Sequence, residues 1–146
     1  MTHSLGVTVA RNVLKAYPWL RRDLVAFVAI AGGNHGTSLC PPNSEGRLMS
    51  CDEVAKGTEW LERLNGPNSD DEVYQPARFM TIYDGTGTND VAYLGPDYAK
   101  SPALRGAVNC EKQDQHNDLR INPAIINVYR KFVELAERRK TDTDCR

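Results

Sequence analysis

Ser4 stands in a short pattern that is typical of a nucleophile elbow. The five residues after Met1 are Thr-His-Ser-Leu-Gly, which match G-x-S-x-G except that Thr2 replaces the first glycine. In such an elbow a strand turns sharply into a helix, so that the serine hydroxyl is exposed and backbone N–H groups point toward the oxygen of an ester carbonyl. The pattern predicts Ser4 as a nucleophile, and the alternative is a helix N-terminus at which Ser4 is an ordinary capping residue.

A serine hydroxyl is a poor nucleophile at neutral pH and needs a neighbouring base. The chain has three histidines, which are His3, His35 and His116. His3 neighbours Ser4, and we expect its side chain to point away from the serine, whereas His35 lies in an Asn-His-Gly-Thr turn. His116 lies in a polar loop before the last expected helix and is therefore predicted as the base, with a solvated loop histidine as the alternative.

The third member of a serine triad is a carboxylate that orients the imidazole and stabilises its charged form. Asp90 fits this role best, since it comes after a glycine-rich turn that follows an expected strand. Asp84 is the competitor because it follows that strand directly, but Asp-Gly is also a turn signal that requires no chemistry. Asp118 is too close to His116 in sequence to be the usual orienting group. The oxyanion of the reaction is expected to be stabilised partly by the backbone N–H of Leu5.

Hydrophobic periodicity predicts a helix that begins at the elbow. Apolar residues recur at three- and four-residue spacings over residues 5–17, and they form an expected apolar face of Val9, Ala10, Val13, Leu14 and Tyr17. Seven consecutive apolar residues at 24–30 then predict a parallel strand that is covered on both faces.

The remaining elements continue this alternation of helices and strands. A helix is expected over residues 52–64 with Asp52 as its N-cap, a strand over 77–83 and a short strand within 104–110. Asn122 and Pro123 are typical of a helix start. The apolar face of that last helix is expected to consist of Ile125, Val128, Tyr129, Phe132 and Ala136. The alternation predicts an α/β fold with a mostly parallel sheet flanked by helices.

The order Ser, Asp, His is the order of the α/β-hydrolases and differs from that of other serine-triad folds. The Val-Thr-Val-Ala-Arg sequence after the elbow and Val-Ala-Ile-Ala-Gly-Gly-Asn-His-Gly at residues 28–36 resemble secreted bacterial lipases and esterases. The chain is similar to the lipase class 2 and polyhydroxyalkanoate depolymerase-like members over about residues 2–135. This resemblance implies the C-terminal part of an α/β-hydrolase domain at residues 1–139, beginning at the nucleophile elbow, and a charged tail at 140–146.

The same resemblance implies hydrolysis of carboxylic esters or lipids through an acyl-enzyme, with Ser4, Asp90 and His116 as the triad. Members of this fold place several strands, among them the strand that leads into the elbow, and the loop with the second oxyanion N–H, before the nucleophile. We expect the strand that pairs with residues 24–30 to lie before Met1. We therefore expect an N-terminally truncated form with weak or no activity alone, which self-associates through an exposed edge of the strand at 24–30. The alternative function is that of an inactive hydrolase remnant or a non-catalytic binding domain.

Length and composition exclude several other classes of protein. The 146 residues, of which 40% are hydrophobic and 25% charged, correspond to one ordinary globular domain. A net charge of -1 provides no basic field for nucleic acid, and the longest apolar run is too short for stable membrane insertion. The chain carries no signal peptide pattern at Met1. The reaction needs no cofactor, and no metal cluster is evident in the sequence.

The cysteine pattern favours disulfides over metal binding. The four cysteines are Cys40, Cys51, Cys110 and Cys145, and none of them lies in a C-x-x-C pair. Four cysteines allow three connectivities, of which we favour a Cys40–Cys51 bridge because these two bracket a segment rich in Pro, Asn, Ser and Gly. Disulfides are typical of oxidising compartments, so an extracellular or periplasmic location is expected for the parent protein.

Overall fold

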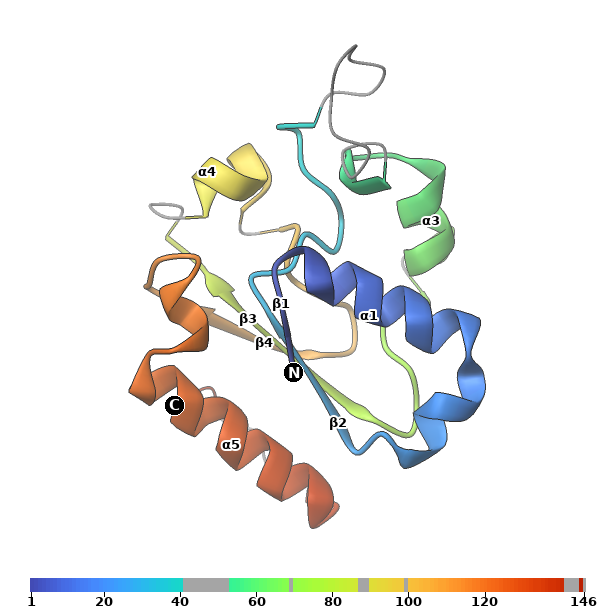
Figure 1. The fold of residues 1–146 in the computed structure, drawn as a ribbon, viewed down its shortest axis with the longest axis vertical. Coiled ribbons are helices and arrows are strands. Elements are labelled where there is room, and N and C mark those ends of the chain that lie inside the picture. Colours follow the sequence, from blue (N-terminus) through green and yellow to red (C-terminus); the bar gives the residue numbers. More distant parts are fainter. Residues whose placement is uncertain (41–52, 69, 87–89, 99, 141–144, 146) are drawn as a thin grey trace.

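The computed structural model describes residues 1–40, 53–68, 70–86, 90–98, 100–140 and 145, and their centre is a parallel β-sheet (Figure 1). The sheet consists of β1 (Thr2–His3), β2 (Ala26–Ile30), β3 (Arg78–Asp84) and β4 (Val108–Lys112), in that spatial order. All three neighbouring pairs run parallel. The α-helices are α1 (Leu5–Ala16), α3 (Glu59–Asn65), α4 (Val91–Leu94) and α5 (Pro123–Glu137). Short 3-10 helices are η1 (Pro18–Asp23), η2 (Gly95–Asp97) and η3 (Asp118–Arg120). The predicted α/β class is confirmed.

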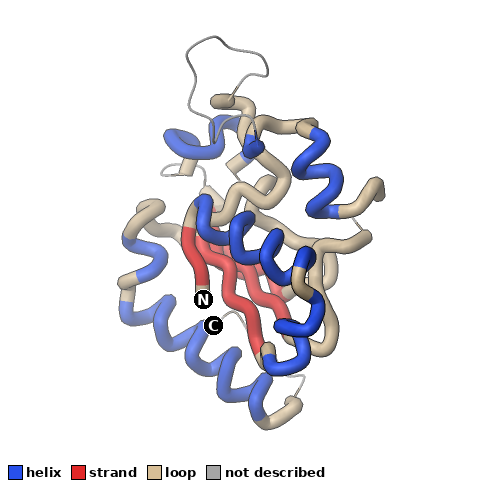
Figure 2. The backbone as a smooth tube through the Cα atoms, turned by 45° about the vertical axis from the view of Figure 1, so that its right-hand side comes forward, coloured by secondary structure: helices blue, strands red, loops and turns tan. Residues whose placement is uncertain are grey.

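The sheet lies between α1 on one face and α5 on the other (Figure 2). Successive strand residues point to opposite faces, so each strand contributes to two cores. The core on the α1 side includes Val7, Leu14, Phe27, Ala29 and Phe79. The core on the α5 side includes Val28, Ile30, Met80, Ile82 and Phe132. This burial on both faces explains why the strand sequences are apolar without alternation.

The helix after the elbow forms as predicted, and Leu14 and Ala10 of its predicted apolar face pack in the core, but the prediction was wrong for Val9, Val13 and Tyr17. The buried residues of α1 are Val7, Thr8, Arg11 and Leu14. Val9 and Val13 are 53% and 39% exposed. The rotation of α1 follows from its close approach to the end of β2, where a Cβ on Gly32 would lie 2.8 Å from the Cβ of Val7. Tertiary packing therefore selects a face that combines the apolar Val7 and Leu14 with the polar Thr8 and Arg11.

The prediction that the strand before the elbow lies wholly before Met1 was also wrong. Thr2 and His3 form β1 and pair with Ala29 and Ile30 of β2. This pairing covers only the C-terminal end of β2. The edge of β2 at Ala26–Val28 has no neighbouring strand on that side within the described ranges.

The other elements agree with the sequence in type and differ at their ends. Helix α3 begins at Glu59, where the Thr58 Oγ1 accepts a hydrogen bond from the backbone N–H of Leu61 at 3.4 Å. The predicted cap, Asp52, lies outside the described residues. Helix α5 begins after Asn122, whose Oδ1 accepts from the N–H of Ala124 at 2.9 Å, as its sequence predicts. None of the helices in the described ranges is long and apolar enough to cross a membrane.

A disulfide joins Cys110 in β4 to Cys145 near the C-terminus, with 5.4 Å between their Cα atoms. This pairing is one of the three connectivities and was not singled out from the sequence. Lys112 also donates a hydrogen bond from its Nζ to the carbonyl oxygen of Cys145. The favoured Cys40–Cys51 bridge involves Cys51, which lies outside the described residues, and it stays a prediction.

Replacing both Cys110 and Cys145 by alanine should lower the free energy of unfolding by about 2 to 4 kcal/mol, because the bridge closes a loop with a sequence separation of 35 residues. Urea unfolding of the oxidised wild-type chain and the double variant measures the difference. The matched control is the wild-type chain in reductant, and an unchanged unfolding midpoint in the double variant would contradict the expectation.

Candidate active site

The parallel sheet brings three predicted site residues to the same edge. Ser4 directly follows β1, Asp90 comes six residues after the end of β3, and His116 comes four residues after the end of β4. The carboxyl ends of parallel strands meet at one edge, where α/β folds place their ligand sites. The fold therefore gathers side chains that are up to 112 residues apart in sequence, from Ser4 to His116.

Ser4 lies on a sharp turn between β1 and α1. Its backbone has φ 54° and ψ -133°, a left-handed conformation that costs free energy in a residue other than glycine. The Ser4 N–H donates to the carbonyl of Ile30 at 2.9 Å, and its own carbonyl accepts from the N–H of Val7 at 3.0 Å. The serine side chain makes no capping hydrogen bond to α1 within the described structure, which removes the alternative of an ordinary cap.

His116 and Asp90 form a buried pair. The His116 Nδ1 lies 2.5 Å from the Asp90 Oδ1, and the two side chains are 5% and 0% exposed. Because an ionised carboxylate can only accept, Nδ1 carries the proton of this bond. The geometry therefore leaves the other ring nitrogen, Nε2, as the basic one. A histidine that takes a proton from a serine must have this tautomer, with the proton on Nδ1 and a free Nε2.

Asp84 has a different position from Asp90. Its Oδ1 accepts from the N–H and the Oγ1 of Thr86, at 3.0 and 2.6 Å. Its Oδ2 accepts from the backbone N–H of Asp90 at 3.4 Å. Asp84 therefore shapes the turn after β3 and helps to hold the main chain of Asp90. Of the two acidic candidates, Asp90 is the one that contacts His116.

Ser4 and His116 line the same pocket, which has a volume of about 180 Å³. Leu5, at the N-terminus of α1, also lies in its wall. The first N–H groups of a helix have no acceptor within the helix, and the helix dipole makes this end attractive to negative charge. Other residues of the wall are Thr8, Gly33, Gly36, Val54, Tyr93 and Leu94. The pocket is therefore mainly apolar, with a polar end at Ser4 and His116.

Two aromatic side chains contact His116 in addition to Asp90. The ring of Tyr93 stacks on the imidazole with 4.0 Å between centroids. His3 reaches the main chain of His116, with its Nε2 2.8 Å from the carbonyl oxygen. Burial lowers the pKa of His3. Neither contact has a signal in the sequence, because both depend on how β1, α4 and the loop of His116 pack together in the fold.

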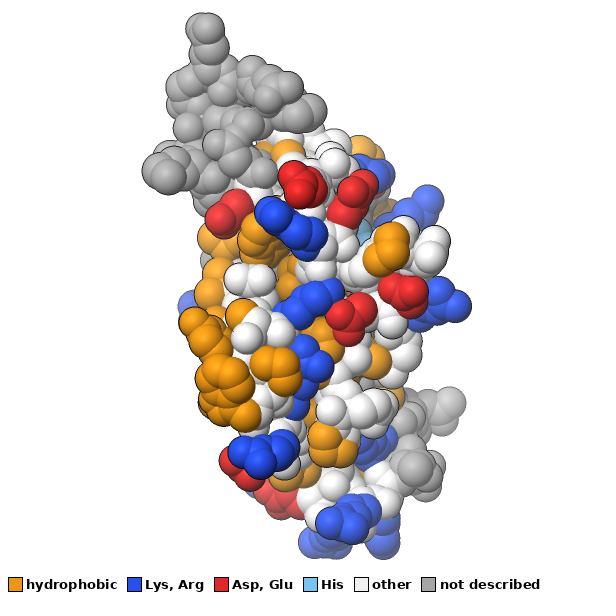
Figure 3. Space-filling view, turned by 90° about the vertical axis from the view of Figure 1, so that its right-hand side faces the viewer, with side chains coloured by type: hydrophobic (Ala, Val, Ile, Leu, Met, Phe, Trp, Pro, Cys, Tyr) orange, Lys and Arg blue, Asp and Glu red, His pale blue; other side chains and the backbone are white. Residues whose placement is uncertain are grey.

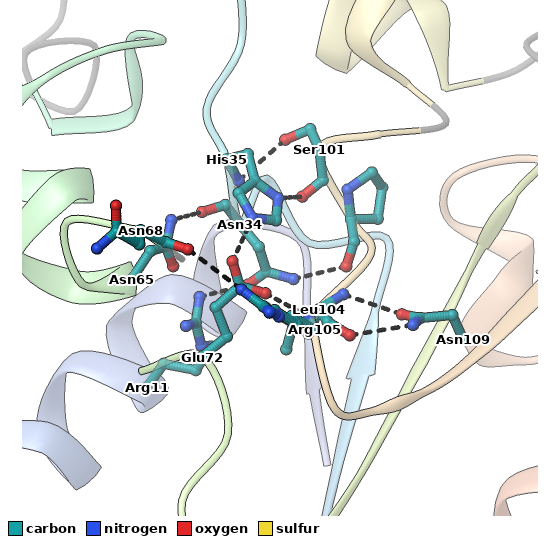
Figure 4. A network of polar contacts seen from close by, with 11 residues as sticks. Arg11, Asn34, His35, Asn65, Asn68, Glu72, Ser101, Leu104, Arg105 and Asn109 are labelled. Atoms are coloured by element: carbon teal, nitrogen blue, oxygen red, sulfur yellow. Dashed lines mark hydrogen bonds and ion pairs between the residues drawn. The ribbon is translucent and has the colours of Figure 1, made fainter. Parts of the chain in front are cut away.

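His35 belongs to a polar network beside the pocket (Figure 4). Its Nε2 lies 2.7 Å from Glu72 Oε1, and its Nδ1 lies 3.1 Å from the carbonyl oxygen of Ser101. Both ring nitrogens thus face acceptors, which favours the charged imidazolium. The hydrogen bond to Glu72 accordingly raises the pKa of His35 above its ordinary value. His35 lies away from the Ser4 pocket and links the loop after β2 to the segment before β4.

The same network contains Arg11 of α1, which is completely buried. Its Nη1 donates to Asn34 Oδ1 at 3.2 Å, and the Asn34 Nδ2 donates to the carbonyl of Pro102 at 2.8 Å. Ser101 donates from its Oγ to the carbonyl of Gly36 at 2.7 Å. Burial lowers the pKa of Arg11. These bonds fix the pocket wall at Gly33 and Gly36, since both glycines neighbour members of the network.

Comparisons with known proteins identify the fold. No family model matches the sequence, and no curated protein is similar to it in sequence. Among solved structures, the chain is similar to phospholipase PlaB from Legionella pneumophila, with a TM-score of 0.52 and 13% sequence identity. The similarity covers 94% of this chain and 45% of the phospholipase, so the chain spans less than half the length of that protein. At this identity the similarity shows the fold alone, a parallel sheet with flanking helices that is consistent with an α/β-hydrolase-like fold.

No cluster of three or more metal-ligating side chains occurs among the residues that the structure describes.

Replacing His35 by glutamine should remove a pH-dependent part of the stability. A histidine whose pKa is raised in the folded state stabilises it fully below its unfolded pKa of about 6.5, and this contribution is lost as the pH rises through the folded pKa. The wild-type chain should therefore exceed His35→Gln in unfolding free energy at pH 5.5 by more than at pH 8.5. Urea unfolding of both chains at a series of pH values measures this. A difference that stays constant across the series would contradict the expectation.

Proposed function

We propose that this chain carries the catalytic triad of a serine hydrolase of carboxylic esters, of the lipase or esterase type. The observation that carries the proposal is the bond of 2.5 Å between His116 Nδ1 and Asp90 Oδ1, beside a pocket that Ser4 also lines. The second support is the backbone of Ser4, which has a positive φ and lies between a strand and a helix. The lipase-like fold agrees with this function, although many functions share one fold.

In the proposed reaction, Ser4 Oγ attacks the carbonyl carbon of the ester while His116 Nε2 takes the hydroxyl proton. The negative charge that develops on the carbonyl oxygen is stabilised by the backbone N–H of Leu5 at the N-terminus of α1. The tetrahedral intermediate collapses, and His116 gives the proton to the leaving alcohol, which leaves an acyl-Ser4 ester. A water molecule, deprotonated by His116, then attacks the acyl-enzyme, and collapse of the second intermediate returns the proton to Ser4 Oγ and releases the acid.

Asp90 has a supporting part in this scheme. Its carboxylate keeps the proton of His116 on Nδ1 and stabilises the imidazolium that forms after each proton transfer. Because both side chains are buried, this interaction is little weakened by solvent. The scheme uses water and the ester alone, with no cofactor.

The apolar pocket wall supports an ester with a hydrophobic acyl group as the substrate class. Leu5, Val54 and Leu94 can contact such a group while the ester lies at Ser4. The structurally similar protein is named as a phospholipase. The proposed partner is therefore an ester or lipid substrate.

We further propose that the chain is the C-terminal part of a longer hydrolase domain. It matches 45% of the phospholipase, and β2 keeps an open edge at Ala26–Val28 in the described structure. The Cys110–Cys145 disulfide supports an extracellular or periplasmic location for the parent protein.

The triad assignment predicts the reaction of Ser4 with a fluorophosphonate, a probe that phosphonylates activated serines. Ser4→Ala should abolish labelling at this site, and His116→Ala should slow it by about 10⁴- to 10⁶-fold, the range seen when triad members are removed. Mass spectrometry of the labelled peptide measures both. If Ser4 stays unlabelled in the wild-type chain, the inactive-remnant alternative is favoured.

The two acidic residues offer a matched pair of variants. Asp90→Asn should slow labelling by about 10⁴-fold, because the amide favours the wrong tautomer of His116. Asp84→Asn keeps an acceptor oxygen for Thr86 and should slow labelling far less. Equal rates for Asp90→Asn and the wild-type chain, with a large loss in Asp84→Asn, would overturn the choice of acid.

Self-association through the sheet edge follows from the open side of β2. The competing contact surface is the exposed apolar face of α1 and η1, which includes Val9, Val13 and Trp19. Figure 3 shows hydrophobic side chains gathered on part of the face that carries these elements. Unpaired strand edges pair readily with another chain. We therefore propose that the isolated chain associates with a second copy through β2.

Sedimentation velocity of residues 1–146 should show a mass that increases with protein concentration. Val25→Lys should shift the chain toward the monomer, since Val25 directly precedes the open edge and is 46% exposed, so the lysine adds charge without loss of a buried contact. Val13→Lys is the matched control on α1. A monomeric wild-type chain, or dissociation by Val13→Lys alone, would contradict pairing through the edge.

A further inference from the structure

His3 connects the strand of the nucleophile to the loop of the base. It is the last residue of β1 and directly precedes Ser4. Its Nε2 lies 2.8 Å from the carbonyl oxygen of His116, a contact between residues 113 positions apart. The two imidazole rings are 4.7 Å apart, with an interplanar angle of 57°. Because a carbonyl can only accept, Nε2 of His3 must carry the proton of this bond.

The contacts of His116 come from two different parts of the fold. Asp90 and Tyr93 hold its ring, and both belong to the segment that follows β3 and includes α4. These two contacts set the rotation and tautomer of the imidazole. These contacts do not fix the distance between Ser4 and the group that His116, Asp90 and Tyr93 form together. The hydrogen bond of His3 supplies that connection, since it starts one residue before the serine and ends on the main chain of His116.

We propose that His3 is a positioning residue, which fixes the main chain of His116 relative to Ser4 and so keeps the base within reach of the nucleophile. This role rests on the proposed function of the site. Proton transfer needs a heavy-atom separation within hydrogen-bond range, and a misplacement of about 1 Å can cost about 100-fold in rate. The side chain acts through its donor, so a residue with an N–H at a similar reach can replace it.

The role differs from that of a pocket residue or of a purely structural one. His3 is not among the described residues that line the pocket, so its loss should leave substrate binding unchanged. It is half-buried, and phenylalanine keeps a ring of similar size against His116 while it removes the donor. Glutamine keeps a donor and removes the ring. The two substitutions separate the hydrogen bond from the packing.

The test uses the 146-residue chain and its His3→Phe and His3→Gln variants. With a p-nitrophenyl ester, His3→Phe should lower kcat by about 10- to 100-fold with KM unchanged, and the rate of labelling of Ser4 by a fluorophosphonate should fall by the same factor. His3→Gln should recover most of both rates. Equal rates in His3→Phe and the wild-type chain, or a His3→Gln variant as slow as His3→Phe, would overturn the proposal.

A second measurement does not depend on activity. The proton on His116 Nδ1, bonded to Asp90, should give a downfield NMR signal in the wild-type chain and in Ser4→Ala. In His3→Phe this signal should broaden or exchange faster with water, and in His3→Gln it should persist. An unchanged signal in His3→Phe would refute the positioning role. If the wild-type chain neither hydrolyses the ester nor reacts at Ser4, the proposed function fails for the 146-residue chain by itself, and the NMR comparison still decides the role of His3.

Failure to fold is checked separately by thermal unfolding of each variant. If His3→Phe does not fold, His3→Met is used in its place, because it fills similar space and also lacks a donor. A His3→Met chain with wild-type rates and an unchanged His116 signal would overturn the proposal, and slow rates with recovery in His3→Gln would support it.

Discussion

The turn at Ser4 is the constraint on which the rest of the site depends. The hydrogen bond from the Ser4 N–H to the Ile30 carbonyl ends the pairing of β1 with β2, and the positive φ of Ser4 redirects the chain into α1. This turn sets the direction of the helix and the place of its N-terminus. It therefore determines that Ser4 and Leu5 both face the pocket. The free energy that such a backbone conformation costs has to be recovered from packing elsewhere.

Much of that packing lies along α1. Val7 fits against Gly32, where no side chain could be added without displacement of the valine. One turn later, Arg11 is buried and bonds to Asn34, which connects the helix to the loop that forms the pocket wall. A buried guanidinium without compensating contacts would destabilise the fold, so the hydrogen bond to Asn34 and the negative charge of Glu72 contribute to its stability. The helix that follows Ser4 is thus held by close packing at one turn and by polar contacts at the next.

The site and the network beside it use histidine in two different ways. His116 has its Nδ1 on the carboxylate of Asp90 and lines the pocket, an arrangement that the proposed proton transfer requires. His35 has both nitrogens on acceptors, which favours its charged form and makes it a link between loops. Asp84 and Asp90 differ in the same way. Asp84 accepts hydrogen bonds from its own turn, whereas Asp90 accepts one from His116. In each pair, the roles follow from the hydrogen-bond partners and not from the residue type.

The sequence by itself determined the main helices and strands other than β1, and the order of the candidate site residues. The apolar run at β2 and the cap at Asn122 are local signals, and local signals are sufficient to place a strand or a helix. The choice of Asp90 and His116 followed from chain order and from their places after strands. Their contact agrees with that choice because parallel strands end at one edge of a sheet.

The tertiary structure alone decided which face of α1 is buried, how β1 pairs and which cysteines meet. The apolar residues Val9 and Val13 point outward while Arg11 is buried, since the turn at Ser4 and the contact with Gly32 fix the rotation of the helix. The bond of His3 to His116 and the Cys110–Cys145 bridge join residues that are far apart in sequence. A single sequence carries no local signal for such contacts, because they depend on the distances between elements that only the packed fold defines.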